Sequence, residues 1–353
     1  MEERMLSTTE HAGDPHTCSA CSPRDLSPDA LLERAAESGM LAPSAYNTQP
    51  WLFRLIRGAL ELHADLSRAR PVADPSGREV YMACGAALEN VRLTLRHLGR
   101  EPDMAILPDP GRPQLVARVC VGPPSPVTHT EARFFTAIPL RRSNRMRFYG
   151  RPLPPGVAPS LQQAAESSGA TLRYILGETS RDALAGIIHD ADRAQARDAG
   201  FRRELGAWLR TNDTDRPDGM PGFAFGMSTP MAALAPMVVR AVPWDRMRVI
   251  RDDDLAREAP LLGVLMTRND EARDWIAAGQ GMQRALLFAT SQGLCAGIMN
   301  QSMQVNATRD RIRRLLCRDL WPLAILRFGF GPETPRTPRR ILEDVLVRTR
   351  DIE

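Results

Sequence analysis

Two segments of this 353-residue chain repeat each other, and this repeat constrains the fold more than any other feature of the sequence. Residues 85–99 and 279–293 have the same length, begin and end with glycine, and carry apolar residues at matching offsets. The apolar spacing is helical, and a closing glycine is typical of a left-handed C-terminal cap. The repeat therefore predicts one core helix in each half of a duplicated chain.

A β-rich segment follows each predicted helix and extends the repeat. Residues 115–122 and 324–331 both end in glycine and both carry an arginine at the same offset. The proline-rich segment 123–130 should separate the halves, because proline lacks a donor and stiffens the chain. We expect half one at 26–122 and half two at 131–353. The alternative is that two unrelated helix–strand pairs recur by chance.

Composition indicates a folded globular chain, with 43% hydrophobic and 25% charged residues. No stretch reaches the roughly 18 apolar residues of a membrane helix, and residues 1–25 are polar without an apolar secretory core. We expect a cytoplasmic protein without a membrane partner, preceded by a disordered tail. The net charge of +4 requires no nucleic-acid surface. The Lys and Arg positions are all arginine, which favours phosphate and carboxylate ligands.

The six cysteines are scattered along the chain. Cys84, Cys120, Cys295 and Cys317 lie in apolar strings and are expected to be small buried residues in a reducing compartment. The Cys18-x-x-Cys21 motif could be half of a zinc site, but no second pair follows at ligand spacing. The polar residues around it favour the tail, and no metal is expected.

Small polar side chains fill a predicted loop between a helix at 28–40 and a strand at 52–56. Ser44, Asn47 and Gln49 offer hydroxyl and amide groups that suit ribityl hydroxyls or the edge of a heteroaromatic ring. Ordinary turn chemistry is the alternative, because these side chains also bond to nearby backbone groups.

Arginines gather at two further places. The string Arg141-x-Ser143-x-Arg145 could place two guanidinium groups around a hydroxyl, which suits one phosphate, and a solvated basic turn is the equal alternative. Residues 335–340 hold three more arginines, kept extended by prolines. Glycine-rich phosphate loops and a Gly-x-Ser-x-Gly motif are missing from the sequence, so a Rossmann dinucleotide site, a nucleotide hydrolase and a serine hydrolase are not expected.

Together, residues 42–51, the 141–145 string and the helix that ends at 292–294 resemble the nitroreductase family of FMN-dependent oxidoreductases. That family usually works as a homodimer with flavin between the subunits. Residues 65–71 and 74–79 contain further arginines and precede the helix at Gly85. With these segments, the chain looks like the duplicated, dormancy-associated Acg-type flavoproteins over roughly residues 27 to 347. The resemblance implies an α+β, nitroreductase-like fold whose two tandem halves form a pseudo-dimer.

The resemblance also implies residue roles. The FMN phosphate would be held by Arg141, Ser143 and Arg145 with help from Arg339 or Arg340, and the flavin would be reached from half one by Ser44, Asn47 and Gln49. The N5 and O4 edge of the ring would lie along Met299, Asn300 and Gln301, where many nitroreductases carry Pro-x-Glu-Gly. Asn300 and Gln301 depart from that pattern, which leaves flavin tuning and hydride access open. No catalytic residue is identified.

Half two lacks the Ser-x-x-Asn-x-Gln string, so the resemblance implies one FMN per chain and a fused chain that replaces the family's dimer. The irregular segment 208–237 is either a lid over the flavin, as in Acg-like proteins, or an ordinary surface excursion. The implied function is hydride transfer from NAD(P)H through FMN to a nitroaromatic or quinone. The alternative is a non-catalytic protein that sequesters FMN beneath the lid, and the sequence does not separate NADH from NADPH.

Overall fold

The computed structural model describes residues 26–243 and 252–348. The fold mixes helices with largely antiparallel sheets, which confirms the α+β class. Its helices are α1 (Pro28–Gly39), α2 (Arg78–His97), α3 (His129–Ala137), α4 (Val157–Glu166), α5 (Glu178–Arg197), α6 (Ala199–Trp208), α7 (Thr229–Ala241), α8 (Asp252–Glu258), α9 (Ala272–Ser291), α10 (Gln301–Gln304) and α11 (Asn306–Leu316). Its strands are β1 (Trp51–Ile56), β2 (Ala59–Ala64), β3 (Arg100–Ile106), β4 (Leu115–Pro124), β5 (Thr171–Tyr174), β6 (Leu209–Arg210), β7 (Met220–Pro221), β8 (Leu261–Thr267), β9 (Cys295–Met299), β10 (Trp321–Gly329) and β11 (Leu346–Arg348).

The two larger sheets repeat one topology. The first has the strand order β11-β1-β2-β4-β3, and the second has the order β5-β8-β10-β9. If β1, β2, β3 and β4 are matched with β5, β8, β9 and β10 in chain order, the strand orders agree and every matched pairing is antiparallel. The matched helices agree as well, because α1 packs on α2 and α4 packs on α9.

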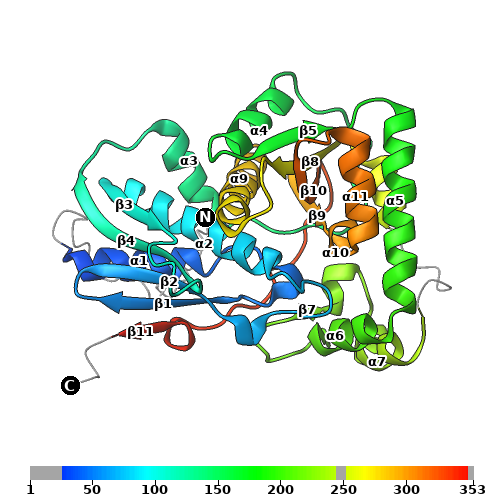
Figure 1. Ribbon diagram of the computed structural model, residues 1–353, viewed down its shortest axis with the longest axis horizontal. Helices are drawn as coiled ribbons and strands as arrows, with labels where there is room; N and C mark the ends of the chain where they lie inside the picture. The colour runs from blue at the N-terminus through cyan, green and yellow to red at the C-terminus, as the bar shows by residue number, and fades with distance from the viewer. Residues whose placement is uncertain (1–25, 244–251, 349–353) are drawn as a thin grey trace, which may run out of the picture.

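Helices α2 and α9 cross at the centre of the molecule, between the two sheets (Figure 1). They contain the two repeated segments of the sequence, and both closing glycines, Gly99 and Gly293, have the predicted left-handed conformation. A side chain on Gly85 would overlap the carbonyl oxygen of Ile276, and one on Gly279 would overlap that of Met82. Each helix therefore approaches the main chain of the other at its own glycine.

Polar pairs beside this crossing are exchanged between the helices in the same way. The Gln283 amide donates to Asn90 at 2.7 Å, and Arg284 donates to Glu89 at 2.9 Å. In the alignment of the two repeats, Glu89 corresponds to Gln283 and Asn90 to Arg284. The 283–90 and 284–89 pairs therefore occupy equivalent positions across the crossing, with both donors on α9.

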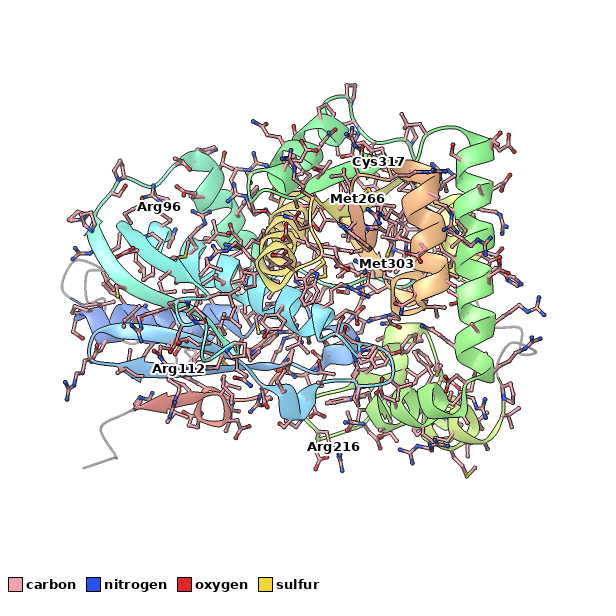
Figure 2. All side chains as sticks on the ribbon, viewed as in Figure 1. Arg96, Arg112, Arg216, Met266, Met303 and Cys317 are labelled. Carbon is pink, nitrogen blue, oxygen red and sulfur yellow. The ribbon has the colours of Figure 1, made fainter. Side chains whose placement is uncertain are left out.

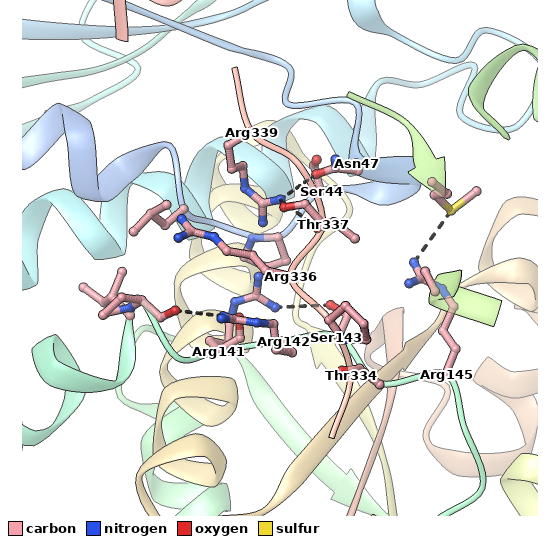
Figure 3. A pocket seen from close by; sticks show the side chains of 17 residues that line it. Ser44, Asn47, Arg141, Arg142, Ser143, Arg145, Thr334, Arg336, Thr337 and Arg339 are labelled. Atoms are coloured by element: carbon pink, nitrogen blue, oxygen red, sulfur yellow. Dashed lines mark hydrogen bonds between the residues drawn. The ribbon is translucent and has the colours of Figure 1, made fainter. Parts of the chain in front are cut away.

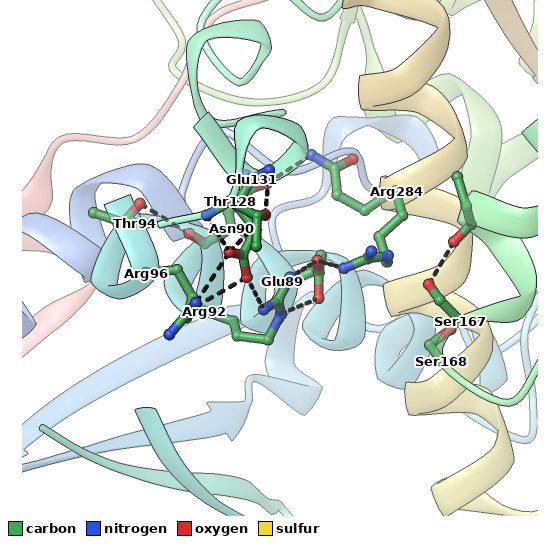
Figure 4. Close-up of polar contacts among 12 residues, drawn as sticks. Glu89, Asn90, Arg92, Thr94, Arg96, Thr128, Glu131, Ser167, Ser168 and Arg284 are labelled. Carbon is green, nitrogen blue, oxygen red and sulfur yellow. Dashed lines mark hydrogen bonds and ion pairs between the residues drawn. The ribbon is translucent and has the colours of Figure 1, made fainter. Parts of the chain in front are cut away.

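A cluster of charged side chains fastens α3 to α2 (Figure 4). Glu131 accepts from Arg96 at 2.9 Å and from Arg92 at 3.2 Å, and its carboxylate also caps its own helix through Thr128. Burial alone would raise the pKa of Glu131, but hydrogen bonds from Arg96, Thr128 and Arg92 outweigh it and lower the pKa to about 2.

Helices α5 to α8 form an insertion between β5 and β8, at the place where half one has only the turn at Arg57 and Gly58. The insertion encloses a second apolar core against the sheet, in which Met266 and Met303 are fully buried (Figure 2). The predicted irregular segment 208–237 lies inside the insertion. Its second part is helix α7, which buries only Ala232.

The C-terminal segment leaves half two and crosses to half one, where β11 pairs in parallel with β1. This segment brings residues 332–340 against the loop at 44–50. Strand β4 runs to Pro124 and α3 begins at His129, so the connection between the halves is shorter than the predicted linker 123–130.

Among the described residues no helix is long and apolar enough to span a bilayer. Of the four described cysteines, which are all free, Cys84 is buried, whereas Cys120, Cys295 and Cys317 are only partly buried. The full burial expected of those three was therefore wrong. Residues 1–25, with the Cys18 and Cys21 motif, lie outside the described part of the chain.

Candidate functional site

A pocket lies where the loop at 44–50, the arginine string at 141–145 and the C-terminal segment meet (Figure 3). Its empty volume is about 630 Å³, counted with the space that opens to solvent. Six of the residues predicted to bind a cofactor line it together, namely Ser44, Asn47, Arg141, Ser143, Arg145 and Arg339. Gln49, Met299, Asn300, Gln301 and Arg340 were predicted with them and are not among the lining residues.

Asn144 holds the arginine string in place. Its main-chain N–H donates to Ala296 at the start of β9 at 2.8 Å, and its side-chain amide donates to the carbonyl of Pro332 at 2.8 Å. The Asn144 carbonyl accepts from Arg327, the repeat-strand arginine of half two, at 2.9 Å. A buried residue held by its main-chain N–H, its carbonyl and its side-chain amide fixes the backbone of the neighbouring residues.

Arg141 is buried, at 5% exposure, without a charge partner among the described residues. One guanidinium nitrogen donates to Ser143 Oγ at 3.2 Å, while its Nε is buried and has no hydrogen-bond partner. Burial, followed by the nearby positive charges of Arg339 and Arg142, lowers the pKa of Arg141 to about 9. A buried guanidinium with an unused donor is a strong binding site for an anion, whose oxygens would accept its hydrogen bonds.

Arg339 reaches the same space from the C-terminal segment. It donates to Asn47 Oδ1 at 2.9 Å and to Thr337 Oγ1 at 2.8 Å, so it connects the two walls of the pocket. Burial and the neighbouring Arg336 and Arg142 lower the pKa of Arg339 to about 10. The pocket lining contains five arginines and no acidic residue.

Arg145 turns away from the other arginines of the pocket (Figure 3). Its guanidinium lies 3.7 Å from Met220 Sδ and over the Phe225 ring at 5.2 Å. Burial lowers the pKa of Arg145, and Asp252 opposes that shift. Of the two arginines expected to flank the Ser143 hydroxyl, Arg141 donates to it, whereas Arg145 points toward Met220 and Phe225.

The loop at 44–50 has a strained backbone. Tyr46, Asn47 and Gln49 have φ values of 53°, 54° and 52°, a region that non-glycine residues seldom adopt. Ser44 Oγ accepts from the main-chain N–H of Gln49 at 2.9 Å, which closes the loop on itself. Such strain persists only where surrounding contacts fix it, and it is frequent at binding sites.

Gln49 and Arg340 form a brace behind the pocket. Gln49 is fully buried, accepts from the Arg340 main chain at 2.9 Å and donates to the Pro217 carbonyl at 2.7 Å. The Arg340 guanidinium donates to the carbonyl of Asp344 at 2.6 Å. These two side chains position the loop and the C-terminal segment.

The segment at 299–301 does not line the pocket, but Gln301 and Arg145 share Asp252 as a neighbour. Met299 belongs to the second apolar core, Asn300 donates to Glu79 at 2.9 Å, and Gln301 donates to Asp252. The Asn300 oxygen is buried without a donor.

We call residues 209–225 the strap, because they lie against the loop at 44–50 and accept hydrogen bonds from Asn47 and Gln49. The strap places Met220 and Ala224 in the pocket lining. Asp218 of the strap pairs with Arg68 of half one and with Arg210 at 2.8 Å, and the Asn47 amide donates to the Gly219 carbonyl at 3.1 Å. The strap is therefore fastened to the predicted binding loop.

Sequence reasoning missed Arg142, Arg336, Met220 and Asp218. Arg142 and Arg336 stand within the two arginine strings that the sequence singled out, so charge alone could have included them. Nothing local marks Met220 or Asp218, because only the tertiary fold brings the strap to the loop.

No family model matches the chain. The chain is 28% identical over 325 residues to a Mycobacterium tuberculosis protein named "Putative NAD(P)H nitroreductase Rv3131", with 90% of this chain and 92% of that protein covered. It is 26% identical over 337 residues to the "Putative NAD(P)H nitroreductase acg" of the same organism, with 91% and 97% covered.

Among solved structures, the FMN-dependent nitroreductase NfnB from Mycobacterium smegmatis, in complex with NADPH, aligns at 17% identity with a TM-score of 0.38. That alignment covers 60% of this chain and 96% of NfnB. The structure of a protein named "putative nitroreductase" from Anabaena variabilis aligns at 10% identity with a TM-score of 0.45, covering 78% of this chain and 69% of the other.

Proposed function

We propose that this chain binds one FMN in the arginine pocket and works as a nitroreductase-type oxidoreductase. It would pass hydride from NAD(P)H through FMN to a small electrophile of the nitroaromatic or quinone class. The observation that carries the proposal is Arg141, a buried guanidinium that faces the pocket without a counter-ion among the described residues. The names of the relatives over nine tenths of the chain support the same reading.

The residues present fit a flavin phosphate. Arg141 and Arg339 supply charge, Ser143 supplies a hydroxyl, and the Arg141 Nε supplies a donor that has no protein partner. Arginine binds phosphate oxygens with two parallel donors, which gives affinity and orientation together. Ser44 and Asn47 would face the ribityl chain from half one, and the position of Arg145 near Tyr46 suits the ring end of the ligand better than the phosphate.

When bound, FMN supplies the hydride chemistry, and the protein supplies binding, orientation and electrostatics. The strained loop would hold Asn47 between Arg339 and the strap. Asn47 would thereby fix the position of the C-terminal segment relative to the loop. Arg145 would place a fixed positive charge at the end of the pocket away from Arg141. Gln49 and Arg340 would brace this arrangement from behind.

We infer further that the chain is a fused duplicate with one working site. The matching strand orders and the reciprocal glycines of α2 and α9 support two equivalent halves. Half one connects α1 to β1 through residues 40–50, which include the binding loop, whereas half two connects α4 to β5 through residues 167–170 only. The shorter connection leaves no room for an equivalent loop, so we expect one FMN per chain and no need for a second subunit.

A second candidate function is FMN sequestration without turnover. The strap favours it, because Met220 and Ala224 line the pocket and the Asp218 pairs hold the strap down. In that case the ring would be closed to nicotinamide.

Anaerobic addition of NADPH to the flavin-loaded protein separates the two functions. If the protein is an oxidoreductase, the flavin absorbance near 450 nm should fall when NADPH is added. It should return when a quinone is then added. Bleaching no faster than that of the same protein without NADPH would contradict turnover and support sequestration. Both functions require the bound flavin, so a protein that takes up no FMN contradicts the whole proposal.

A further inference from the structure

Four guanidinium groups meet at one end of the pocket. Arg141 and Arg142 come from the string after α3, and Arg336 and Arg339 come from the C-terminal segment (Figure 3). Arg336 is close enough to the other three to lower the pKa of each. None of the four has an ion-pair partner among the residues that the structure describes, and the lining offers no carboxylate.

One phosphate does not balance this charge. A phosphate monoester carries about −1.5 to −2 charges at neutral pH, against four positive charges here. About two positive charges therefore stay uncompensated when a single FMN phosphate is bound. Like charges in a partly buried site repel strongly, so this excess favours a further anion.

The four arginines divide into an inner and an outer pair. Arg141 is buried against Ser143, and Arg339 is held by Asn47 and Thr337. Arg142 is only half-buried and donates solely to the carbonyls of Pro139, at 2.7 Å, and of Arg141, at 2.9 Å.

Arg336 is exposed and has no hydrogen bond to the described part of the protein. The outer pair, Arg142 and Arg336, is thus free to meet a ligand at the mouth. Carbonyl bonds occupy one Arg142 nitrogen and leave the others available.

We propose that Arg142 and Arg336 bind a second phosphate group, next to the one bound by Arg141 and Arg339. This inference rests on the proposed FMN site and adds to it. The second phosphate can come from the flavin itself, if the chain accepts FAD, or from a nicotinamide nucleotide that binds after FMN. Both sources present the same chemistry to the outer pair.

Calorimetric titrations can separate these sources in three arms. The first compares FMN with FAD on flavin-free protein, the second adds NADP⁺ to FMN-loaded protein, and the third adds inorganic pyrophosphate to FMN-loaded protein. Each arm uses the wild type, the double variant Arg142→Ala with Arg336→Ala, and a control. The control, Arg54→Ala with Arg173→Ala, removes the same charge from exposed strand positions away from the pocket.

The proposal predicts a second anion that depends on the outer pair. A preference for FAD over FMN of at least about tenfold would assign the phosphate to the flavin, and NADP⁺ binding to loaded protein would assign it to a separate nucleotide. Binding of pyrophosphate alone would support the same site with a free anion as its ligand. In each case the double variant should lose at least about tenfold while its FMN affinity changes less than about threefold, and the control should match the wild type.

Two results would contradict these proposals in different ways. A wild type that binds FMN but shows no FAD preference and no NADP⁺ or pyrophosphate binding would overturn the proposal, because all four arginines would then serve one phosphate. A wild type that binds no flavin would instead contradict the proposed function. Thermal unfolding of the double variant checks that it is folded, and removal of two repelling charges should not lower its melting temperature.

Discussion

Gly85 of α2 and Gly279 of α9 hold reciprocal positions, because each glycine faces the carbonyl oxygen of the residue three places before the other. The two helices can cross this closely only where neither carries a side chain. The same positions correspond in the sequence repeat. The crossing therefore brings the two repeated segments together at equivalent positions.

Substitution of either glycine should weaken the joint between the halves. Gly279→Ala should lower the free energy of unfolding by about 3 kcal/mol, because its Cβ would overlap the Met82 carbonyl and backbone must move. Gly186→Ala in α5 is the matched control, since its Cβ would meet open space and alanine favours helix by about 1 kcal/mol. Urea unfolding of both variants measures the difference, and equal stabilities would contradict the close crossing.

Replacement of Arg141 should weaken FMN binding but stabilise the flavin-free protein. Arg141→Met should reduce FMN affinity by at least about a hundredfold, or about 3 kcal/mol, because the phosphate loses its buried partner. The flavin-free variant should be more stable than the wild type by about 1 kcal/mol or more, because a buried charge without a counter-ion is removed. Calorimetry with FMN and urea unfolding measure the two effects, with exposed Arg54→Met as control. A less stable variant would show that Arg141 is already compensated.

The Asp218 pairs should govern how fast flavin leaves. Asp218→Asn weakens the contacts with Arg68 and Arg210 and should raise the rate of FMN release by about tenfold, or about 1.4 kcal/mol in the barrier. Asp215→Asn, at an exposed strap position, should leave the rate unchanged. Stopped-flow dilution of the FMN-loaded proteins, followed by the rise in fluorescence of free FMN, measures the release. Identical rates in the two variants would mean that the strap does not gate the pocket.

Acid should release the charged cluster around Glu131. Its folded-state pKa of about 2 lies below the ordinary value near 4.5, so its contribution is present above pH 4.5 and lost as pH falls toward 2. In the wild type this loss should be roughly 3 kcal/mol across that window. Glu131→Gln has no such carboxylate, so its stability should fall less steeply with acid. Urea midpoints between pH 6 and pH 2.5 test this, and parallel curves for the two proteins would refute it.

The sequence predicted those parts of the molecule that depend on local pattern. The helices that contain Gly85 and Gly279 follow from apolar spacing, and their left-handed caps at Gly99 and Gly293 follow from glycine itself. The α+β class is confirmed. It could be predicted because the sequence contains apolar spacings typical of helices and others typical of strands.

The finer arrangement depends on contacts between distant segments. Arg145 turns toward Met220 because the strap supplies a thioether and an aromatic ring there, and no local pattern encodes where a strap docks. Gln49 braces the loop because the C-terminal segment lies behind it, almost 300 residues later in the chain. The role of residues 299–301 at a flavin edge stays a prediction.

The number of FMN molecules bound per chain distinguishes one working pocket from two. Flavin-free protein should be titrated with FMN in a calorimeter at low salt, with Arg141→Met measured beside it. We expect one FMN per chain, bound exothermically by the wild type and at least about a hundredfold more weakly by the variant. Two sites per chain would contradict the single working pocket, and an unchanged affinity in Arg141→Met would contradict the assignment of the phosphate to this arginine.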